Sequence, residues 1–112
     1  MIGTLFRRSK ITSTMTIQAT QLSLYYSPYC PYCQRVLNAL VEMGLNVDIK
    51  AGNASGMTLE NTFFNRAAKK ALKTGGGRTT VPCLRIERDG KTEWMYESLD
   101  IIAFLKQQLK RQ

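Results

Sequence analysis

The sequence Cys-Pro-Tyr-Cys stands between a strand-like and a helix-like segment, and this junction restricts the fold more than any other feature of the chain. Residues 22–26 form a β-rich run. Residues 34–43 carry apolar side chains at helical spacing, and Pro31 suits a first helical turn because its missing N–H would have no partner there. The pattern predicts a strand, a turn that carries Cys30 and Cys33, and then a helix.

Apolar periodicity and turn residues predict the elements that follow. These are a strand, a helix, a two-stranded hairpin and a last helix, at residues 46–51, 58–73, 83–88 with 91–96, and 98–109. The order β-α-β-α-β-β-α predicts an α/β fold, with a four-stranded mixed sheet covered by helices. Cys30 and Cys33 then lie at the carboxyl end of the first strand, where open α/β sheets bind ligands.

The composition limits the chemistry of the chain. A length of 112 residues suits a single domain. The sequence contains no histidine, which excludes histidine acid–base catalysis and mixed Cys/His zinc sites. Only Cys83 is left to join the cysteine pair, so we expect no structural metal. No apolar run approaches the roughly 18 residues of a membrane span, so we expect no membrane association.

The first 20 residues differ from the rest because they are basic, rich in hydroxyl groups and free of acids. We expect residues 1–20 to be an extension without regular structure and residues 21–112 to be the domain. Organelle transit peptides share this composition, and Met15 is an alternative start. We therefore expect a cytoplasmic location, with organelle targeting by residues 1–14 as the alternative. The net charge of +8 suits anionic partners, but no nucleic-acid motif accompanies it, so we expect no nucleic-acid binding.

A cysteine pair at a strand-to-helix junction has a specific chemical use. The N–H groups and the positive dipole end at a helix start favour the ionised form of the first thiol. Cys33 lies about one turn further on, within reach of a disulfide with Cys30. Cys30 is thus the candidate nucleophile and Cys33 the candidate resolving thiol. An inert buried pair is the alternative, although Tyr29 and Tyr32 beside the cysteines favour an exposed site.

Residues 26–33, Tyr-Ser-Pro-Tyr-Cys-Pro-Tyr-Cys, resemble the active site of the dithiol glutaredoxins. Residues 80–82 resemble the Thr-Val-Pro segment of that family, whose proline is cis and faces the cysteines. Residues 97–98 are similar to the Glu-Ser pair in the amino-terminal domain of glutathione transferases. The likeness covers residues 22–109 and implies a thioredoxin-like fold.

The resemblance also implies a function. The implied function is that of a glutathione-disulfide oxidoreductase. Such a protein would be a monomer that uses glutathione as its reductant and binds no metal. Its substrates would be disulfide-containing or glutathionylated proteins, with Cys30 as nucleophile and Cys33 as resolving thiol. The residues expected to bind glutathione are Tyr32, Val81, Pro82, Glu97, Ser98 and Arg78. Arg78 enters because Ser27 occupies the position where many glutaredoxins carry a lysine, three residues before the first cysteine.

Two other functions fit the same sequence. One is a non-catalytic module, similar to the glutathione transferase domain, that docks a partner through basic side chains in the second predicted helix. The other is an iron–sulfur cluster carrier that uses Cys30 from two chains. For Cys83 we expect a small buried hydrophobic residue at the start of a strand.

Overall fold

A computed structural model describes residues 17–109 of the chain. Its centre is β2 (Leu22–Tyr26), which pairs in parallel with β5 (Met57–Asn61) and antiparallel with β6 (Cys83–Arg88). Three further strands complete a six-stranded sheet of order β3-β4-β5-β2-β6-β7, namely β3 (Val47–Asp48), β4 (Asn53–Ala54) and β7 (Lys91–Tyr96). All five residues of β2 are buried, as expected of a central strand covered on both faces.

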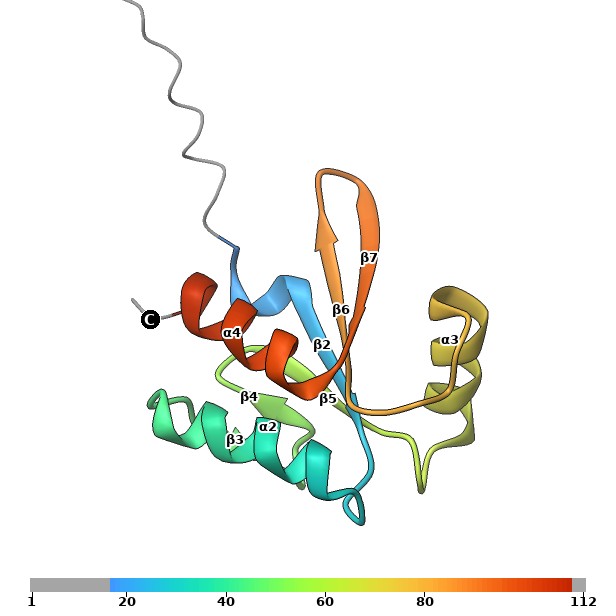
Figure 1. The fold of residues 1–112 in the computed structure, drawn as a ribbon, viewed down its shortest axis with the longest axis horizontal. Coiled ribbons are helices and arrows are strands. Elements are labelled where there is room, and N and C mark those ends of the chain that lie inside the picture. Colours follow the sequence, from blue (N-terminus) through green and yellow to red (C-terminus); the bar gives the residue numbers. More distant parts are fainter. Residues whose placement is uncertain (1–16, 110–112) are drawn as a thin grey trace, which may run out of the picture.

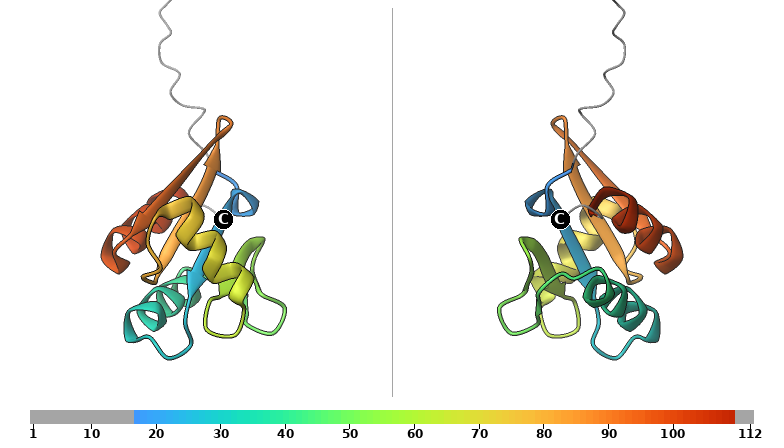
Figure 2. Two further views of the ribbon diagram at one scale, coloured as in Figure 1. Left: turned by 90° about the vertical axis from the view of Figure 1, so that its right-hand side faces the viewer. Right: turned by 90° about the vertical axis from the view of Figure 1, so that its left-hand side faces the viewer.

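Helices cover both faces of the sheet (Figure 1). α2 (Pro31–Glu42) and α4 (Ser98–Leu109) pack against each other on one face, and α3 (Arg66–Gly76) lies on the other (Figure 2). Side chains of β2 alternate between the two faces. Leu22, Leu24 and Tyr26 join the larger core under α2 and α4, whereas Tyr25 joins a smaller core under α3.

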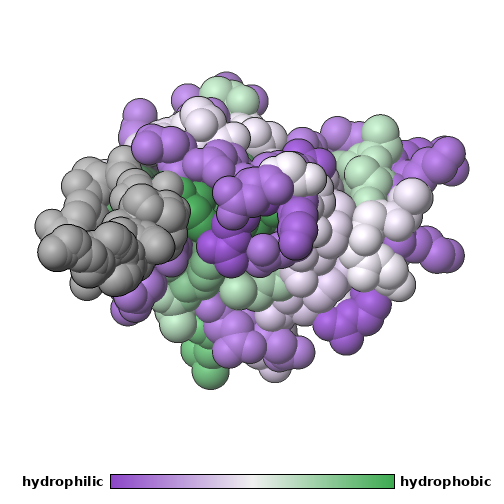
Figure 3. Space-filling model, turned by 90° about the horizontal axis from the view of Figure 1, so that it is seen from above, coloured by the Kyte–Doolittle hydropathy of each residue, from purple (hydrophilic) through white to green (hydrophobic). Residues whose placement is uncertain are grey.

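The face of the molecule seen in Figure 3 is mainly hydrophilic. Seen from above, hydrophobic residues show only in small areas between charged and polar ones (Figure 3). Within residues 17–109, no helix combines the length and the apolar character that crossing a membrane requires.

Most predicted elements occur near their predicted places. β2, α2, the β6–β7 hairpin and α4 match the sequence patterns. Gly44 follows α2 with a φ of +88°, and Asp89 and Gly90 have φ values of +55° and +73° in the hairpin turn. Such left-handed residues end helices and form tight hairpins. The α/β prediction is therefore confirmed.

The prediction of a four-stranded sheet is wrong, because the sheet has six strands. The predicted strand at 46–51 is only the two-residue β3, which pairs with the two-residue β4 at the edge of the sheet. The parallel partner of β2 is β5, further along the chain. A strand parallel to β2 was thus predicted correctly, but that strand begins about ten residues after its predicted position.

The predicted helix at 58–73 is also wrong in its first half. Residues 57–61 form β5, with Met57 and Leu59 buried on one face. α3 begins only after Asn65, whose side-chain oxygen accepts a hydrogen bond from the backbone N–H of Ala68 at 3.1 Å. This N-cap fixes the start of α3 at a residue that the apolar pattern alone does not identify.

The folded part begins before the expected boundary at residue 21. Ile17 and Ala19 are buried against the larger core, and η2 (Ala19–Gln21) is a turn of 3-10 helix that leads into β2. Residues 17–20 therefore belong with the domain. The expectations about targeting by residues 1–14 and a start at Met15 concern residues outside the described part.

Candidate active site

Cys30 occupies the residue immediately before α2. It is the N-cap, with an extended backbone, and its carbonyl oxygen accepts the first helical hydrogen bond from Gln34 N–H at 3.0 Å. The turn before it closes through a bond from Cys30 N–H to the Ser27 carbonyl at 3.2 Å. The Cys30 thiol is half-buried and donates to the Val81 carbonyl oxygen at 3.8 Å. The first cysteine thus lies at the positive end of a helix and partly open to solvent.

Cys33 lies one turn into α2 and is fully buried. Burial raises the pKa of its thiol to about 12. The backbone N–H of Ser27, 3.4 Å from the sulfur, opposes that rise, and the hydrogen bond and charge of Cys30 add to it. No disulfide joins Cys30 to Cys33 in the structure. Their environments differ in the way that a nucleophile and a resolving thiol require, because only Cys30 is accessible from outside.

The segment opposite Cys30 carries the Val81–Pro82 peptide bond, which is cis. Val81 precedes β6, so it lies outside the strand ladder, and it is half-buried against the larger core. The contact between the Cys30 thiol and the Val81 carbonyl joins this segment to the start of α2. The cysteine pair and the cis-proline segment therefore lie side by side, although Cys30 and Val81 are 51 residues apart in the sequence.

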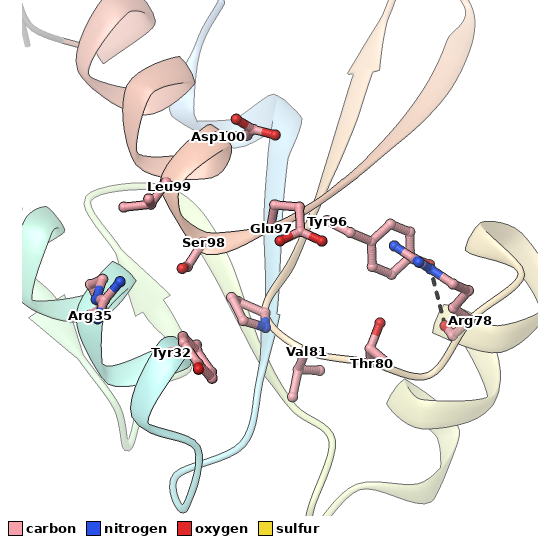
Figure 4. A pocket seen from close by; sticks show the side chains of 11 residues that line it. Tyr32, Arg35, Arg78, Thr80, Val81, Tyr96, Glu97, Ser98, Leu99 and Asp100 are labelled. Atoms are coloured by element: carbon pink, nitrogen blue, oxygen red, sulfur yellow. Dashed lines mark hydrogen bonds between the residues drawn. The ribbon is translucent and has the colours of Figure 1, made fainter.

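A pocket of about 550 Å³ opens beside this segment. Its walls come from α2, the stretch before β6, the end of β7 and the start of α4 (Figure 4). All six residues expected to bind glutathione line this pocket, together with five others. The full lining is Tyr32, Arg35, Arg78, Thr80, Val81, Pro82, Tyr96, Glu97, Ser98, Leu99 and Asp100. The structure therefore brings the predicted binding residues into one cavity.

The start of α4 gives the pocket its acidic and hydroxyl groups. Ser98 is the first residue of α4, is 7% exposed and still reaches the pocket. Glu97 has a φ of +80°, a conformation that non-glycine residues rarely adopt. In Figure 4 the Glu97 side chain lies above Val81 and the Ser98 side chain lies above Tyr32. Backbone strain of this kind concentrates at functional sites, where the surrounding structure holds it in place.

The positive charge of the pocket comes from two arginines. The Arg78 guanidinium lies 4.2 Å from the centroid of the Tyr96 ring, and the Tyr96 hydroxyl donates to the Arg78 carbonyl oxygen at 3.3 Å. Arg35 lies on α2, with its guanidinium 5.6 Å from the centroid of the Tyr32 ring. Both cations are therefore held by aromatic rings at the pocket wall.

The last turn of α3 packs closely on β7 and thereby positions Arg78. A Cβ atom at Gly75 would overlap the Trp94 ring, and one at Gly76 would overlap the Tyr96 hydroxyl. Gly77 then ends the helix with a φ of +87°. The glycines thus allow the chain to turn directly from α3 into the Arg78 segment.

Sequence reasoning missed Arg35, Tyr96 and Leu99 as pocket residues. Arg35 had a detectable signal, because a residue three positions after Tyr32 shares its helical face. Tyr96 and Leu99 had none, since the pocket forms only when β7 and α4 meet α2. Three basic side chains of α3 do not line the pocket, namely Arg66, Lys69 and Lys70.

Cys83 does not line the pocket but lies behind its wall in the smaller core, fully buried as expected. Burial raises the pKa of its thiol to about 11, opposed by a hydrogen bond with Tyr96 and the charge of Arg78. Among residues 17–109, no three cysteine, aspartate or glutamate side chains lie together as a metal site would need.

Comparison with known proteins agrees with this geometry. The family described as "Glutathione S-transferase, N-terminal domain" matches residues 29–108. A mutant of a thioredoxin-like protein superposes with a TM-score of 0.54 at 20% identity, covering 82% of this chain and 97% of that one. A wheat glutaredoxin superposes with a TM-score of 0.51 at 21% identity, covering 81% of this chain and 74% of that one.

A search among curated proteins gave no significant match. The two structural neighbours share the fold, and the family match covers the cysteine pair, the cis-proline segment and the start of α4. The chain therefore belongs to the glutathione S-transferase amino-terminal domain family and has a thioredoxin-like fold.

Proposed function

We propose that the protein is a glutathione-dependent thiol-disulfide oxidoreductase that acts through Cys30 and Cys33. The observation that carries the proposal is the difference between the two thiols beside one pocket. Cys30 is partly exposed at a helix start, whereas Cys33 is buried and its pKa is raised to about 12. An attacking thiol must be reachable and ionisable, and a resolving thiol must be sheltered until the first has reacted.

With a glutathionylated protein as substrate, the Cys30 thiolate attacks the sulfur of the glutathionyl group. A Cys30–glutathione disulfide forms, the original disulfide breaks, and the protein thiolate leaves and takes a proton from water. The thiolate of a second glutathione then attacks the glutathionyl sulfur. Oxidised glutathione leaves, and the Cys30 thiolate is restored.

With a protein disulfide as substrate, the first attack leaves the protein bound to Cys30. Cys33 loses its proton and attacks the Cys30 sulfur, which releases the reduced protein and forms a Cys30–Cys33 disulfide. The Ser27 N–H, which already points to the Cys33 sulfur at 3.4 Å, would stabilise the Cys33 thiolate during this step. Two glutathione molecules then reduce the disulfide and become oxidised glutathione.

The pocket offers groups that complement each part of glutathione. The backbone of Val81 would pair with the cysteinyl unit as a short added strand. The start of α4 and the Ser98 hydroxyl suit the γ-glutamyl carboxylate, and the carboxylates of Glu97 and Asp100 suit its ammonium group. Arg78 suits the remaining carboxylate. Tyr32 would pack beside the bound sulfur.

The test compares Cys30→Ser, Cys33→Ser and Cys83→Ala in the reduction of a glutathionylated peptide and of a protein disulfide, each followed as oxidised glutathione formed. We expect Cys30→Ser to abolish turnover. Cys33→Ser should retain turnover of the mixed disulfide but lose that of a protein disulfide. Cys83→Ala, which removes a buried thiol that does not line the pocket, is the control and should retain both. Full activity of Cys30→Ser would overturn the mechanism.

The family match also favours a second function, that of a glutathione-binding module without catalysis. Isothermal titration distinguishes the two. Glutathione binding by a wild-type protein that shows no turnover would establish the module.

A further inference from the structure

Three aromatic side chains form an exposed cluster close to Cys30, which we call the aromatic surface. Tyr29, Phe63 and Phe64 are 68%, 59% and 68% exposed. The ring centroids of Tyr29 and Phe63 are 4.7 Å apart, and those of Phe63 and Phe64 are 4.8 Å apart, in edge-to-face contacts. These contacts leave most of each ring in water. Adjacent exposed aromatic rings are typical of sites that a partner covers.

The backbone loop that carries Phe63 and Phe64 is held in place by hydrogen bonds. The Asn61 side-chain oxygen accepts hydrogen bonds from Phe63 N–H and Phe64 N–H at 2.9 Å and 3.1 Å. Thr62 donates to the Tyr26 carbonyl oxygen through its backbone N–H at 2.8 Å and its hydroxyl at 3.0 Å. The loop that carries Phe63 and Phe64 is thus hydrogen-bonded to the end of β2, and the turn that carries Cys30 begins at the same end. Rings presented on a fixed backbone bind a partner at a low entropic cost.

The position of the aromatic surface relates it to the reacting sulfur. Tyr29 is the residue next to Cys30 in the chain. None of the three aromatic residues lines the glutathione pocket, which the residues from Tyr32 to α4 enclose. Figure 1 shows the β2–α2 turn and the β5–α3 loop at the same edge of the molecule, with α4 across from α3. The surface therefore adjoins Cys30 without being part of the pocket.

The charge beyond the aromatic surface is positive. α3 begins directly after it and carries four cations, Arg66, Lys69, Lys70 and Lys73, with no acidic residue in its sequence. A partner that covers the rings and extends along α3 would meet these cations. Complementarity then requires acidic side chains in that partner.

We propose that the aromatic surface binds the protein substrate, through an apolar side chain next to its oxidised cysteine and acidic residues beyond it. This inference rests on the proposed function. While glutathione occupies the pocket, the substrate protein needs a second surface that reaches the same sulfur. The aromatic surface is next to Cys30, is apolar and leads onto a cationic helix, so it selects an apolar and acidic segment.

The experiment uses two glutathionylated peptides that differ at a single residue. Both carry two glutamates, and the residue beside the modified cysteine is phenylalanine in one and serine in the other. We expect the wild-type protein to favour the phenylalanine peptide by about tenfold in kcat/KM. The double variant Phe63→Ser/Phe64→Ser should reduce this preference to below about twofold. Its turnover of a small mixed disulfide, glutathione joined to 2-mercaptoethanol, should stay within about twofold of wild type.

Val41→Ser is the matched control. Val41 is 59% exposed on the last turns of α2, so this variant also replaces an exposed apolar side chain, but far along the helix from Cys30. It should keep the peptide preference of the wild type. Because all three substituted side chains are exposed, we expect unchanged unfolding midpoints, which circular dichroism checks.

Each other outcome has a defined meaning. Equal kcat/KM for the two peptides, with normal turnover of the small mixed disulfide, would overturn the substrate surface and leave the proposed function standing. Absence of turnover of the small mixed disulfide by wild type would overturn the proposed function itself. A wild-type dimer in sedimentation that the double variant converts to a monomer would assign the surface to a second copy of the chain. Co-sedimentation with phosphatidylserine vesicles that the double variant loses would assign it to a lipid surface. Either result would overturn the proposal.

Discussion

The thiol of Cys30 donates a hydrogen bond to the carbonyl oxygen of Val81, with the sulfur 3.8 Å from the oxygen. The contact joins the start of α2 to the cis-proline segment across one wall of the 550 Å³ pocket. A ligand that pairs with the Val81 backbone would therefore bring its own cysteine sulfur next to Cys30. This relationship favours a thiol-containing peptide as the ligand of the pocket.

The unequal burial of the cysteines predicts selective alkylation. Cys30 is half-buried, whereas Cys33 and Cys83 are fully buried and their thiol pKa values are raised to about 12 and about 11. We expect limiting iodoacetamide at neutral pH to modify Cys30 at least tenfold faster than the other two, because the thiolate is the reactive form. Peptide mass spectrometry after timed quenching measures the three rates. Equal rates in the native protein would contradict the assigned burial, and denaturant should make them similar.

The raised thiol pKa values also predict how stability depends on pH. The pKa of Cys83 rises from an ordinary value of 9.0 to about 11 in the folded protein. Above about pH 9 the unfolded chain releases this proton while the folded protein keeps it, so the free energy of unfolding falls as pH rises. The expected loss is about 1 kcal/mol per buried thiol between about pH 9 and pH 10. Urea unfolding of reduced wild type and Cys83→Ala should show a shallower decline in the variant. Parallel declines would show that Cys83 does not contribute.

The left-handed conformation of Glu97 predicts a conflict between stability and ligand binding. At a φ of +80°, a residue with a Cβ atom costs about 1 kcal/mol relative to glycine. Glu97→Gly should therefore raise the free energy of unfolding by up to about 1 kcal/mol while it weakens glutathione binding. Glu97→Gln is the control, since it keeps the Cβ and loses the charge. Glu97→Gln should weaken glutathione binding without raising the free energy of unfolding. An equal rise in the free energy of unfolding in both variants would argue against backbone strain at this residue.

Arg78 predicts a charge-dependent contribution to glutathione affinity. The guanidinium is held over the Tyr96 ring at the pocket wall, where it can meet a carboxylate. Arg78→Ala should raise the KM for glutathione about tenfold, and Arg78→Lys should recover part of that loss. The effect should shrink in high salt. Steady-state kinetics at two ionic strengths provide the measurement, and Lys106→Ala, an exposed cation of α4 outside the pocket, is the control.

Local sequence patterns predicted the elements around Cys30 because those elements are strongly periodic and clearly delimited. Pro31 and the apolar stripe define α2, and the positive-φ pair Asp89-Gly90 defines the hairpin. The sequence motifs also singled out Val81 and Ser98, and the structure brings both into the lining of one pocket. Residues on no motif, such as Tyr96, became part of the pocket only through tertiary packing.

The error at β5 has a physical cause. Leu59 and Phe63 lie four residues apart, so they fit a helical row, but Met57 and Leu59 also fit the alternation of a strand. Pairing with β2, more than 30 residues earlier, decides between the two, and a local pattern contains no information about that contact. The exposure of Phe63 and Phe64 shows that these side chains were never part of a helical core face.

The most direct test of the account is to identify the cysteine that accepts glutathione. The Cys33→Ser variant is incubated with oxidised glutathione, and peptide mass spectrometry locates the adduct. The account predicts one glutathione on Cys30 and none on Cys83, with the adduct removed by added reduced glutathione. An unmodified Cys30, or equal modification of Cys83, would contradict it.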